Sequence, residues 1–181
     1  MCWAAGVAAA CRGESSAKQD SAATPAAAAV VHDSSAVTTL DGIAPAKVGM
    51  SVQQLSAALG HPVAPAKGNK RACRYIQSAS LPIDVALMLV NDTVARVDVD
   101  STGAHTSEGA YVGDPESRVM QIYRGNIVVQ PHKYTGPVGH YLIVTPPSDT
   151  TRRIIFETDG EKVLRYRVGR RPEVEFVEGC S

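Results

Sequence analysis

An internal repeat constrains the fold of this chain more than any other feature of its sequence. The segments Val48-Gly49-Met50-Ser51 and Val112-Gly113-Asp114-Pro115 each open a helix-like stretch. The first stretch ends at Gly60 and the second at Gly125. Self-similarity at a fixed period is the signature of one supersecondary unit used more than once. The repeat therefore predicts two tandem copies of one unit.

The helix of each copy carries its own start signal. In the first copy, Ser51 is placed to cap the helix while Gln54 reaches back in a capping box. In the second copy, Asp114 is the predicted cap and Pro115 takes the first helical position. Helices this short are marginal alone in water, so each is expected to pack its apolar side on a sheet. The apolar positions are Val52, Leu55 and Leu59 in the first helix and Val119, Ile122 and Tyr123 in the second.

Strand signals follow each helix. Each copy ends in two strands joined by a short turn, Asn91-Asp92 in the first and Asp159-Gly160 in the second. After these turns, Val94-Ala95-Arg96-Val97 aligns with Val163-Leu164-Arg165-Tyr166. The predicted strands span residues 72–76, 84–90 and 93–100 in the first copy and 140–145, 153–158 and 162–168 in the second.

Alternation in the last strand of each copy predicts an antiparallel sheet with one apolar and one charged face. The predicted fold is α+β: two tandem helix-plus-antiparallel-sheet units, at residues 40–106 and 107–181, with their helices packed on the apolar face. The charged face is expected to be exposed. The apolar side holds Ala95, Val97, Val99, Leu164, Tyr166 and Val168, and the charged side holds Arg96, Asp98, Asp100, Arg165 and Arg167.

The charged face is the candidate binding surface, with Arg96, Asp98, Arg165 and Arg167 as its contact residues. Either Tyr166 or Tyr141 is a candidate aromatic anchor beside them. The alternative is that the charges neutralise one another and form an ordinary solvated surface. That alternative pairs Arg165, Arg167, Arg170 and Arg171 with the acidic residues that follow, Glu173, Glu175 and Glu178.

The first 39 residues have a different composition from the rest. Residues 1–11 are apolar and small and resemble the end of a bacterial lipoprotein signal, in which Cys11 would carry the lipid. Residues 12–39 are rich in Ala, Ser and Thr and are predicted to be a disordered tether. The alternative is the disordered N-terminus of a cytoplasmic protein.

Two cysteines, Cys73 and Cys180, lie in the predicted folded part. An oxidising compartment would make them a disulfide, and without export they would be two unpaired buried thiols. The export implied by the leader favours the disulfide. No cysteine or histidine cluster has zinc-site spacing, so no metal is predicted.

The first copy resembles a known signature. Val48-Gly49-Met50-Ser51, the apolar helix positions and Leu59-Gly60 are similar to the "Gly-Met-Ser/Thr, helix, Leu-Gly" pattern of small bacterial envelope proteins. These include the SmpA/OmlA group of outer-membrane assembly lipoproteins and the secreted β-lactamase-inhibitor proteins, which carry the unit twice. The resemblance implies two helical segments on an antiparallel sheet in each unit, and protein binding without catalysis. The second copy departs from the pattern at Asp114-Pro115, and no inhibitory residues carry over.

A second hypothesis concerns the segment Pro131 to Gly139, which reads as a loop. His132 and His140 flank residues 133–139 of this segment and, with Glu157 or Asp159, could form the acid/base group of a small hydrolase or ligand-binding enzyme. If the chain instead binds another protein, this loop is expected to contact the partner together with the charged face, and His132, Tyr134 and His140 are candidate binding residues.

Charge and motifs exclude several other classes. Lysine plus arginine and aspartate plus glutamate both number 18, so no global field draws the chain to nucleic acid or to an anionic membrane. No glycine-rich phosphate-binding motif occurs, and no cofactor is predicted.

The leading hypothesis is a monomeric, exported envelope protein that binds another envelope or secreted protein. It would be periplasmic, or anchored to the outer membrane only through Cys11. A purely structural envelope lipoprotein is the third possibility.

Overall fold

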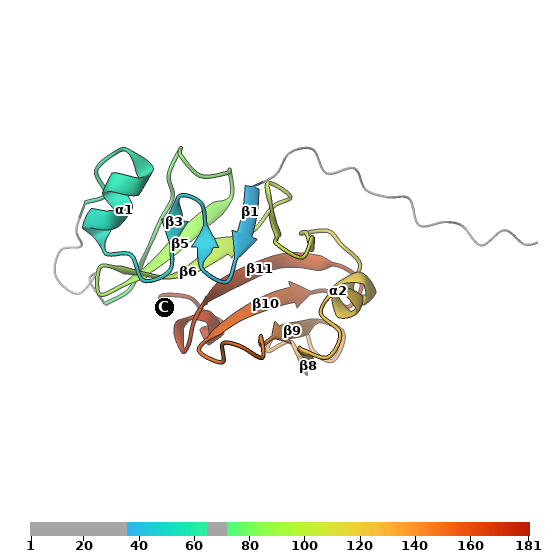
Figure 1. The fold of residues 1–181 in the computed structure, drawn as a ribbon. Coiled ribbons are helices and arrows are strands. Elements are labelled where there is room, and N and C mark those ends of the chain that lie inside the picture. The colour runs from blue at the N-terminus through green and yellow to red at the C-terminus, as the bar shows by residue number, and fades with distance from the viewer. Residues whose placement is uncertain (1–35, 65–71) are drawn as a thin grey trace, which may run out of the picture. The chain divides into compact units, whose positions relative to one another are not determined.

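The computed structural model describes residues 36–64 and 72–181, which form an α+β fold with two sheets (Figure 1). The predicted leader, its Cys11 and most of the predicted tether lie outside the described residues. The last four residues assigned to the tether, Ala36–Thr39, form a strand of the fold.

Seven strands form one antiparallel sheet. They are β4 (Arg74–Ile76), β5 (Val85–Val90), β6 (Thr93–Val99), β8 (Ile127–Pro131), β9 (His140–Val144), β10 (Arg152–Thr158) and β11 (Val163–Arg170). Their order in the sheet is β4-β5-β6-β11-β10-β9-β8. The final strands of the two predicted units, β6 and β11, therefore pair at the middle, where Val99 lies opposite Tyr166.

A smaller sheet and two helices cover one side of this large sheet (Figure 1). The smaller sheet has the order β3-β2-β1-β7, in which β1 runs parallel to β7 and antiparallel to β2. No helix within the described residues is long and apolar enough to cross a bilayer. The elements are β1 (Ala36–Thr39), β2 (Gly42–Ile43), β3 (Ala46–Lys47), β7 (Ala104–Thr106), α1 (Val52–Leu59) and α2 (Glu116–Ile122).

The main hydrophobic core lies between these elements and the side of the large sheet that we call the first face. Leu55 of α1 and Val119 of α2 belong to one buried cluster with Val97, Phe156 and Val168 of the sheet. A smaller cluster, made of Tyr141, Ile155 and Val174, lies on the opposite side, the second face.

Helix α1 begins and ends as its sequence predicts. The Ser51 hydroxyl accepts a hydrogen bond from the Gln54 amide (3.3 Å), and the Gln54 side-chain oxygen accepts one from the Ser51 amide (2.9 Å). This capping box satisfies two of the amides that a helix start leaves unpaired. Gly60 ends the helix with φ of 76°, a left-handed conformation that glycine adopts without a steric penalty.

Helix α2 starts differently from the prediction. Its N-cap is Pro115, and no side chain caps the helix. The Asp114 carboxylate instead accepts hydrogen bonds from the Tyr111 amide (2.8 Å) and from Arg118 Nε (3.1 Å). Asp114 thus stabilises the turn before the helix, and its predicted role as the cap is wrong.

In both halves, the segment that leads into the helix forms the same backbone hydrogen bonds with the last strand of that half and with the turn before this strand. Gly49 and Gly113 have φ of 94° and 92°, values that favour glycine. Three backbone hydrogen bonds recur at matched positions. They are Gly49 N to Val94 O (2.8 Å), Val94 N to Met50 O (2.9 Å) and Val52 N to Asp92 O (2.9 Å) in the first half, and Gly113 N to Val163 O (2.8 Å), Val163 N to Asp114 O (2.9 Å) and Glu116 N to Glu161 O (2.9 Å) in the second.

The two hairpins differ at their turns. Asn91 and Asp92 form the predicted two-residue turn, and both have positive φ as a tight hairpin requires. The second turn is longer than the predicted Asp159-Gly160, because the last paired residues of its strands are Thr158 and Val163, so that the turn spans residues 159–162.

Both hairpins contain an irregularity at the aligned position of their last strand. The register shifts leave Ala95 in β6 and Leu164 in β11 without a partner on the preceding strand, which makes each a bulge residue. A bulge interrupts alternation, and Leu164 is consequently 45% exposed. The prediction that Leu164 shares the apolar face with Tyr166 and Val168 is therefore wrong.

The bulge gives a direct test of the register. We expect Leu164→Ala to change the free energy of unfolding by no more than about 0.5 kcal/mol, because this side chain lies on the surface. The matched change Leu142→Ala, at a fully buried leucine of β9, should cost about 2 to 5 kcal/mol. Urea denaturation of both variants measures the difference, and a large loss for Leu164→Ala would contradict the bulge.

Candidate functional site

The second face of the large sheet is covered by the end of the chain. We call residues 171–181 the C-terminal segment; it contains the short helix η2 (Glu173–Glu175), which contacts β6, β10 and β11. Val174 is fully buried against Tyr141 and Ile155. The charged face is therefore not the open surface that alternation predicts.

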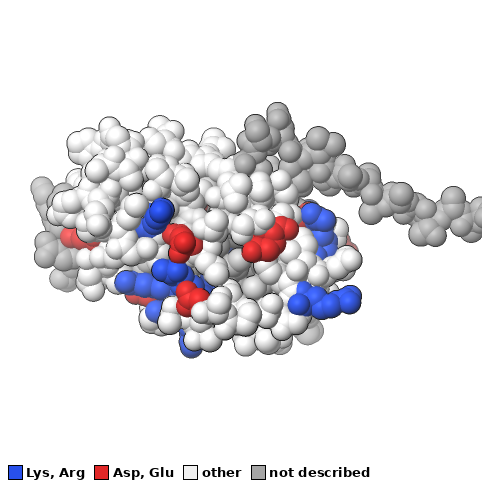
Figure 2. Space-filling model, in the orientation of Figure 1, with Lys and Arg blue, Asp and Glu red and all other residues white. Residues whose placement is uncertain are grey.

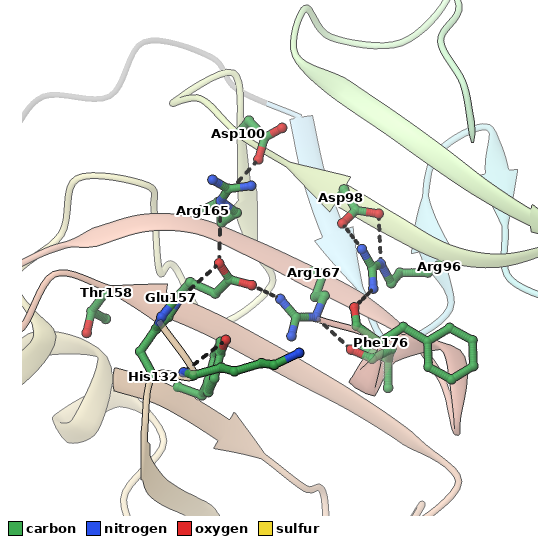
Figure 3. A network of polar contacts seen from close by, with 12 residues as sticks. Arg96, Asp98, Asp100, His132, Glu157, Thr158, Arg165, Arg167 and Phe176 are labelled. Atoms are coloured by element: carbon green, nitrogen blue, oxygen red, sulfur yellow. Dashed lines mark hydrogen bonds and ion pairs between the residues drawn. The ribbon is translucent and has the colours of Figure 1, made fainter. Parts of the chain in front are cut away.

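Arg167 of β11 is hydrogen-bonded to the backbone of the C-terminal segment that covers it. Its side chain is only 4% exposed, and its Nε donates a hydrogen bond to the Val174 carbonyl (2.6 Å). Its guanidinium also pairs with the Glu157 carboxylate (Figure 3). It lies 5.7 Å from the centre of the Tyr141 ring. A buried charge needs such partners, because its hydration is lost on folding.

Arg96 makes a similar set of bonds one strand away. It is also 4% exposed, and its Nη1 donates to the carbonyls of Glu173 (3.1 Å) and Phe176 (2.7 Å). Its Nε and Nη2 bind the Asp98 carboxylate (2.9 and 2.7 Å) (Figure 3). Nη2 also donates to the Tyr75 hydroxyl (2.6 Å). Burial raises the pKa of Asp98, although the hydrogen bonds and charge of Arg96 act in the opposite direction.

The candidate contact residues on the charged face therefore divide into two groups. Arg96 and Arg167 are buried, and Asp98 is mostly covered, so the expectation that they are exposed is wrong. Arg165 is 57% exposed and lies between Asp100 (3.9 Å) and Glu157 (3.5 Å) (Figure 3). Neither candidate aromatic anchor is free, because Tyr166 lies in the main core and Tyr141 lies beneath His132 and Arg167.

Charge neutralisation accounts for much of the basic run at the end of β11. Arg170 pairs with Glu173 (3.0 Å), and Arg171 pairs with Glu175 (2.9 Å). On the side of the molecule in Figure 2, basic and acidic side chains lie near one another and neither sign dominates a large area.

The two histidines of the loop are directed to different carboxylates. His132 lies on the second face, where its Nε2 is 3.6 Å from Glu157 and its ring stacks on Tyr141 (4.5 Å between centroids). His140 bonds through Nδ1 to Glu116 (3.0 Å), at the start of α2. The structure does not bring His132 and His140 together at one carboxylate. Within the described residues, no group of three or more His, Cys, Asp or Glu side chains is arranged to hold a metal ion.

The loop and the C-terminal segment meet at Glu178. Lys133 Nζ lies 2.8 Å from its carboxylate, and the Tyr134 hydroxyl also bonds to it. These hydrogen bonds lower the pKa of Glu178. The Tyr134 side chain is exposed.

Exposed aromatic rings collect around the C-terminal segment. Within the described residues the exposed aromatic side chains are Tyr75, Tyr134 and Phe176, and each one contacts or belongs to this segment. Hollows of about 420 and 390 Å³ lie beside residues 177–179. We call the three rings and the two hollows the C-terminal surface. Sequence alternation could not indicate it, because it is assembled from the β4 strand, a loop and the chain end.

The disulfide expected from the sequence is present. Cys73 and Cys180 are joined, with their Cα atoms 5.3 Å apart, and the bond ties the C-terminal segment to the start of β4. The unpaired-thiol alternative does not hold for this structure.

Comparison with known proteins gives little further information. No family model and no curated protein matches the chain. Among solved structures, the chain is similar to the uncharacterized protein yfeY from Escherichia coli, with 14% sequence identity and a TM-score of 0.42. That match covers 74% of this chain and 99% of the yfeY chain.

The buried arginines should dominate the stability of the second face. We expect Arg167→Met to cost roughly 3 to 5 kcal/mol of unfolding free energy, because it leaves Glu157 and the Val174 carbonyl buried without their main partner. Arg165→Met removes the same group from an exposed site and should cost no more than about 1 kcal/mol. Denaturation curves of both variants check this, and equal effects would contradict the burial of Arg167.

Proposed function

We propose that this chain is a non-catalytic protein-binding module whose partner docks on the C-terminal surface. The gathering of Tyr75, Tyr134 and Phe176 beside two hollows supports this proposal best. Tyrosine and other large side chains in pockets contribute most of the energy of typical interfaces. Arg165 and Lys133, both about half exposed, supply charged groups at the rim.

The way the surface is built also favours binding. The disulfide and the two buried arginines fix the C-terminal segment at several points. A surface that is already ordered loses less conformational entropy when a partner binds. The mixed charges of the surface favour recognition of a specific local pattern over attraction to any highly charged polymer.

We further propose an exported protein that acts in the bacterial cell envelope. A disulfide persists in oxidising compartments such as the periplasm, and the lipoprotein-like leader ending at Cys11 is consistent with this location. The partner is then another envelope or secreted protein, bound by a monomeric inhibitor, immunity protein or assembly factor. A lipid at Cys11 is the proposed membrane attachment.

We also propose that the fold consists of two tandem copies of one unit that share the large sheet. Three backbone hydrogen bonds at matched positions, and the bulges at Ala95 and Leu164, support this duplication. The resemblance to the SmpA/OmlA group and the β-lactamase-inhibitor proteins rests on the same unit. It is incomplete, because each half has one α-helix within the described residues where those families have a pair of helical segments.

The duplication can be tested through the missing cap of α2. Pro115 occupies the place that Ser51 takes in the first half, and its backbone is extended in the same way (φ −58°, ψ 140° against φ −68°, ψ 163°). We expect Pro115→Ser to be more stable than Pro115→Ala by about 1 kcal/mol, because only serine supplies a capping oxygen. Thermal or urea unfolding of the two variants measures this, and equal stabilities would count against the equivalence.

The binding function can be tested by affinity capture from a detergent extract of the host envelope. The baits are the wild-type protein, the double variant Tyr134→Ala/Phe176→Ala, and the control Val37→Ala/Ile83→Ala, which removes exposed apolar groups outside the C-terminal surface. We expect one partner to be retained by the wild type and the control and weakened at least about 30-fold by the double variant. A partner that binds all three baits equally would contradict this location, and no partner for any bait would contradict the proposed function.

A further inference from the structure

The disulfide lies at the wall of a surface hollow and not in the core. Cys73 and Cys180 are both partly exposed. They line the hollow of about 420 Å³ together with Lys133, Phe176 and the last residues of the chain. A small thiol, or the exposed cysteine of a redox protein, can therefore approach the sulfur atoms from solvent without the fold opening first.

The charge at the hollow suits the reacting species. Thiol–disulfide exchange proceeds through a thiolate anion, which attacks one sulfur of the bond. Lys133 contributes an ammonium group to the wall, and it is shared with Glu178, to which it bonds at 2.8 Å. Lys133 thereby offsets the negative charge of the Glu178 carboxylate, which lines the same hollow and would otherwise repel the incoming thiolate.

The C-terminal segment is held unevenly along its length. Its first part is fixed to the sheet by Arg96 and Arg167 through the carbonyls of Glu173, Val174 and Phe176. Residues 177–181 have one backbone hydrogen bond within the described residues, from Ser181 N to Glu178 O (3.3 Å), which is internal to the segment. Their other attachments are the partly buried Val177, the packing of Gly179 against Tyr75, the exposed Glu178 contacts and the disulfide.

We propose that Cys73–Cys180 is a thiol-exchange site for a dithiol reductant and that its reduction releases residues 177–181 while the rest of the fold stays intact. One thiolate of the dithiol attacks a cysteine sulfur, the Cys73–Cys180 bond breaks, and the other cysteine leaves as a thiolate. The second thiol of the reductant then displaces the protein from this mixed disulfide. The reductant departs as a disulfide, and two electrons and two protons remain on Cys73 and Cys180.

Release would change the shape of the C-terminal surface. Residues 177–179 line both hollows, so they form the wall between them. Their departure would join the two hollows beside Tyr75 and Arg165. The effect of this change on a partner rests on the proposed binding function, whereas the exchange and the release do not.

The test is reduction of the folded, full-length protein by dithiothreitol without denaturant. Alkylation and peptide mass spectrometry report on Cys73 and Cys180 separately from the two N-terminal cysteines. We expect the native disulfide to be reduced within about tenfold of its rate in denaturant, because access needs no global unfolding. Lys133→Gln should slow the reaction about threefold, and the matched Arg171→Gln, which removes a cation outside the hollow, should not.

Hydrogen exchange on the reduced protein reports on the release. We expect the Ser181 amide, which bonds to Glu178 within the segment, to exchange faster after reduction, while the amides of Glu175 and Phe176, which bond to Pro172 and Glu173, keep their protection. The variant Cys73→Ser/Cys180→Ser should show the same pattern. Reduction slowed by a thousandfold or more in the native state would overturn the exchange site, and loss of protection throughout the fold would overturn the local release. Neither result depends on a partner, so failure here leaves the binding proposal standing.

Discussion

Two buried guanidinium groups bind backbone carbonyls of the C-terminal segment, and the second face of the sheet depends on these bonds. Arg96 and Arg167 are each neutralised by a carboxylate, Asp98 and Glu157, and each has donors left that must be satisfied. The carbonyls of the C-terminal segment meet that need and bring Val174 down onto the sheet. A buried N–H donor without an acceptor costs folding free energy. The C-terminal segment and the two arginines therefore stabilise one another. The sheet is thus covered on both faces, by helices and a small sheet on the first and by the chain end on the second.

The proposed repeat and the proposed binding surface lie in different parts of the structure. Matched hydrogen bonds and bulges relate the two halves, and the strand order places β6 and β11 side by side at the centre of the large sheet. Among residues 36–64 and 72–106 of the first half, no segment corresponds to the C-terminal segment. The C-terminal segment gives the aligned residues Arg96 and Arg165 different environments, one buried and one exposed. The features that we connect with function therefore lie in a segment to which the proposed repeat does not extend.

The sequence is sufficient for the regular parts of the fold and insufficient for the irregular ones. Six strands, the capped helix α1, the Asn91-Asp92 turn and the disulfide could be predicted, because each has a local signal or a cysteine pair. The two-residue strands β2 and β3 are too short to show a period, and β8 contains a proline. Alternation cannot detect a bulge such as that at Leu164. The cover over Arg96 and Arg167 was missed because it is made through backbone carbonyls, which leave no mark on residue type.

Exchange of the arginine Nε protons with water, followed by NMR on nitrogen-labelled protein, tests the central claim most directly. The Nε–H of Arg167 donates to the Val174 carbonyl in a buried site, whereas Arg165 is largely exposed. We predict that the Arg167 proton exchanges at least about a hundredfold more slowly than that of Arg165, because exchange requires local opening of the segment. Removal of residues 172–181 should abolish the difference. If the Arg167 and Arg165 protons exchange at similar rates in the intact protein, the C-terminal segment is not held by the buried arginines and the account is wrong.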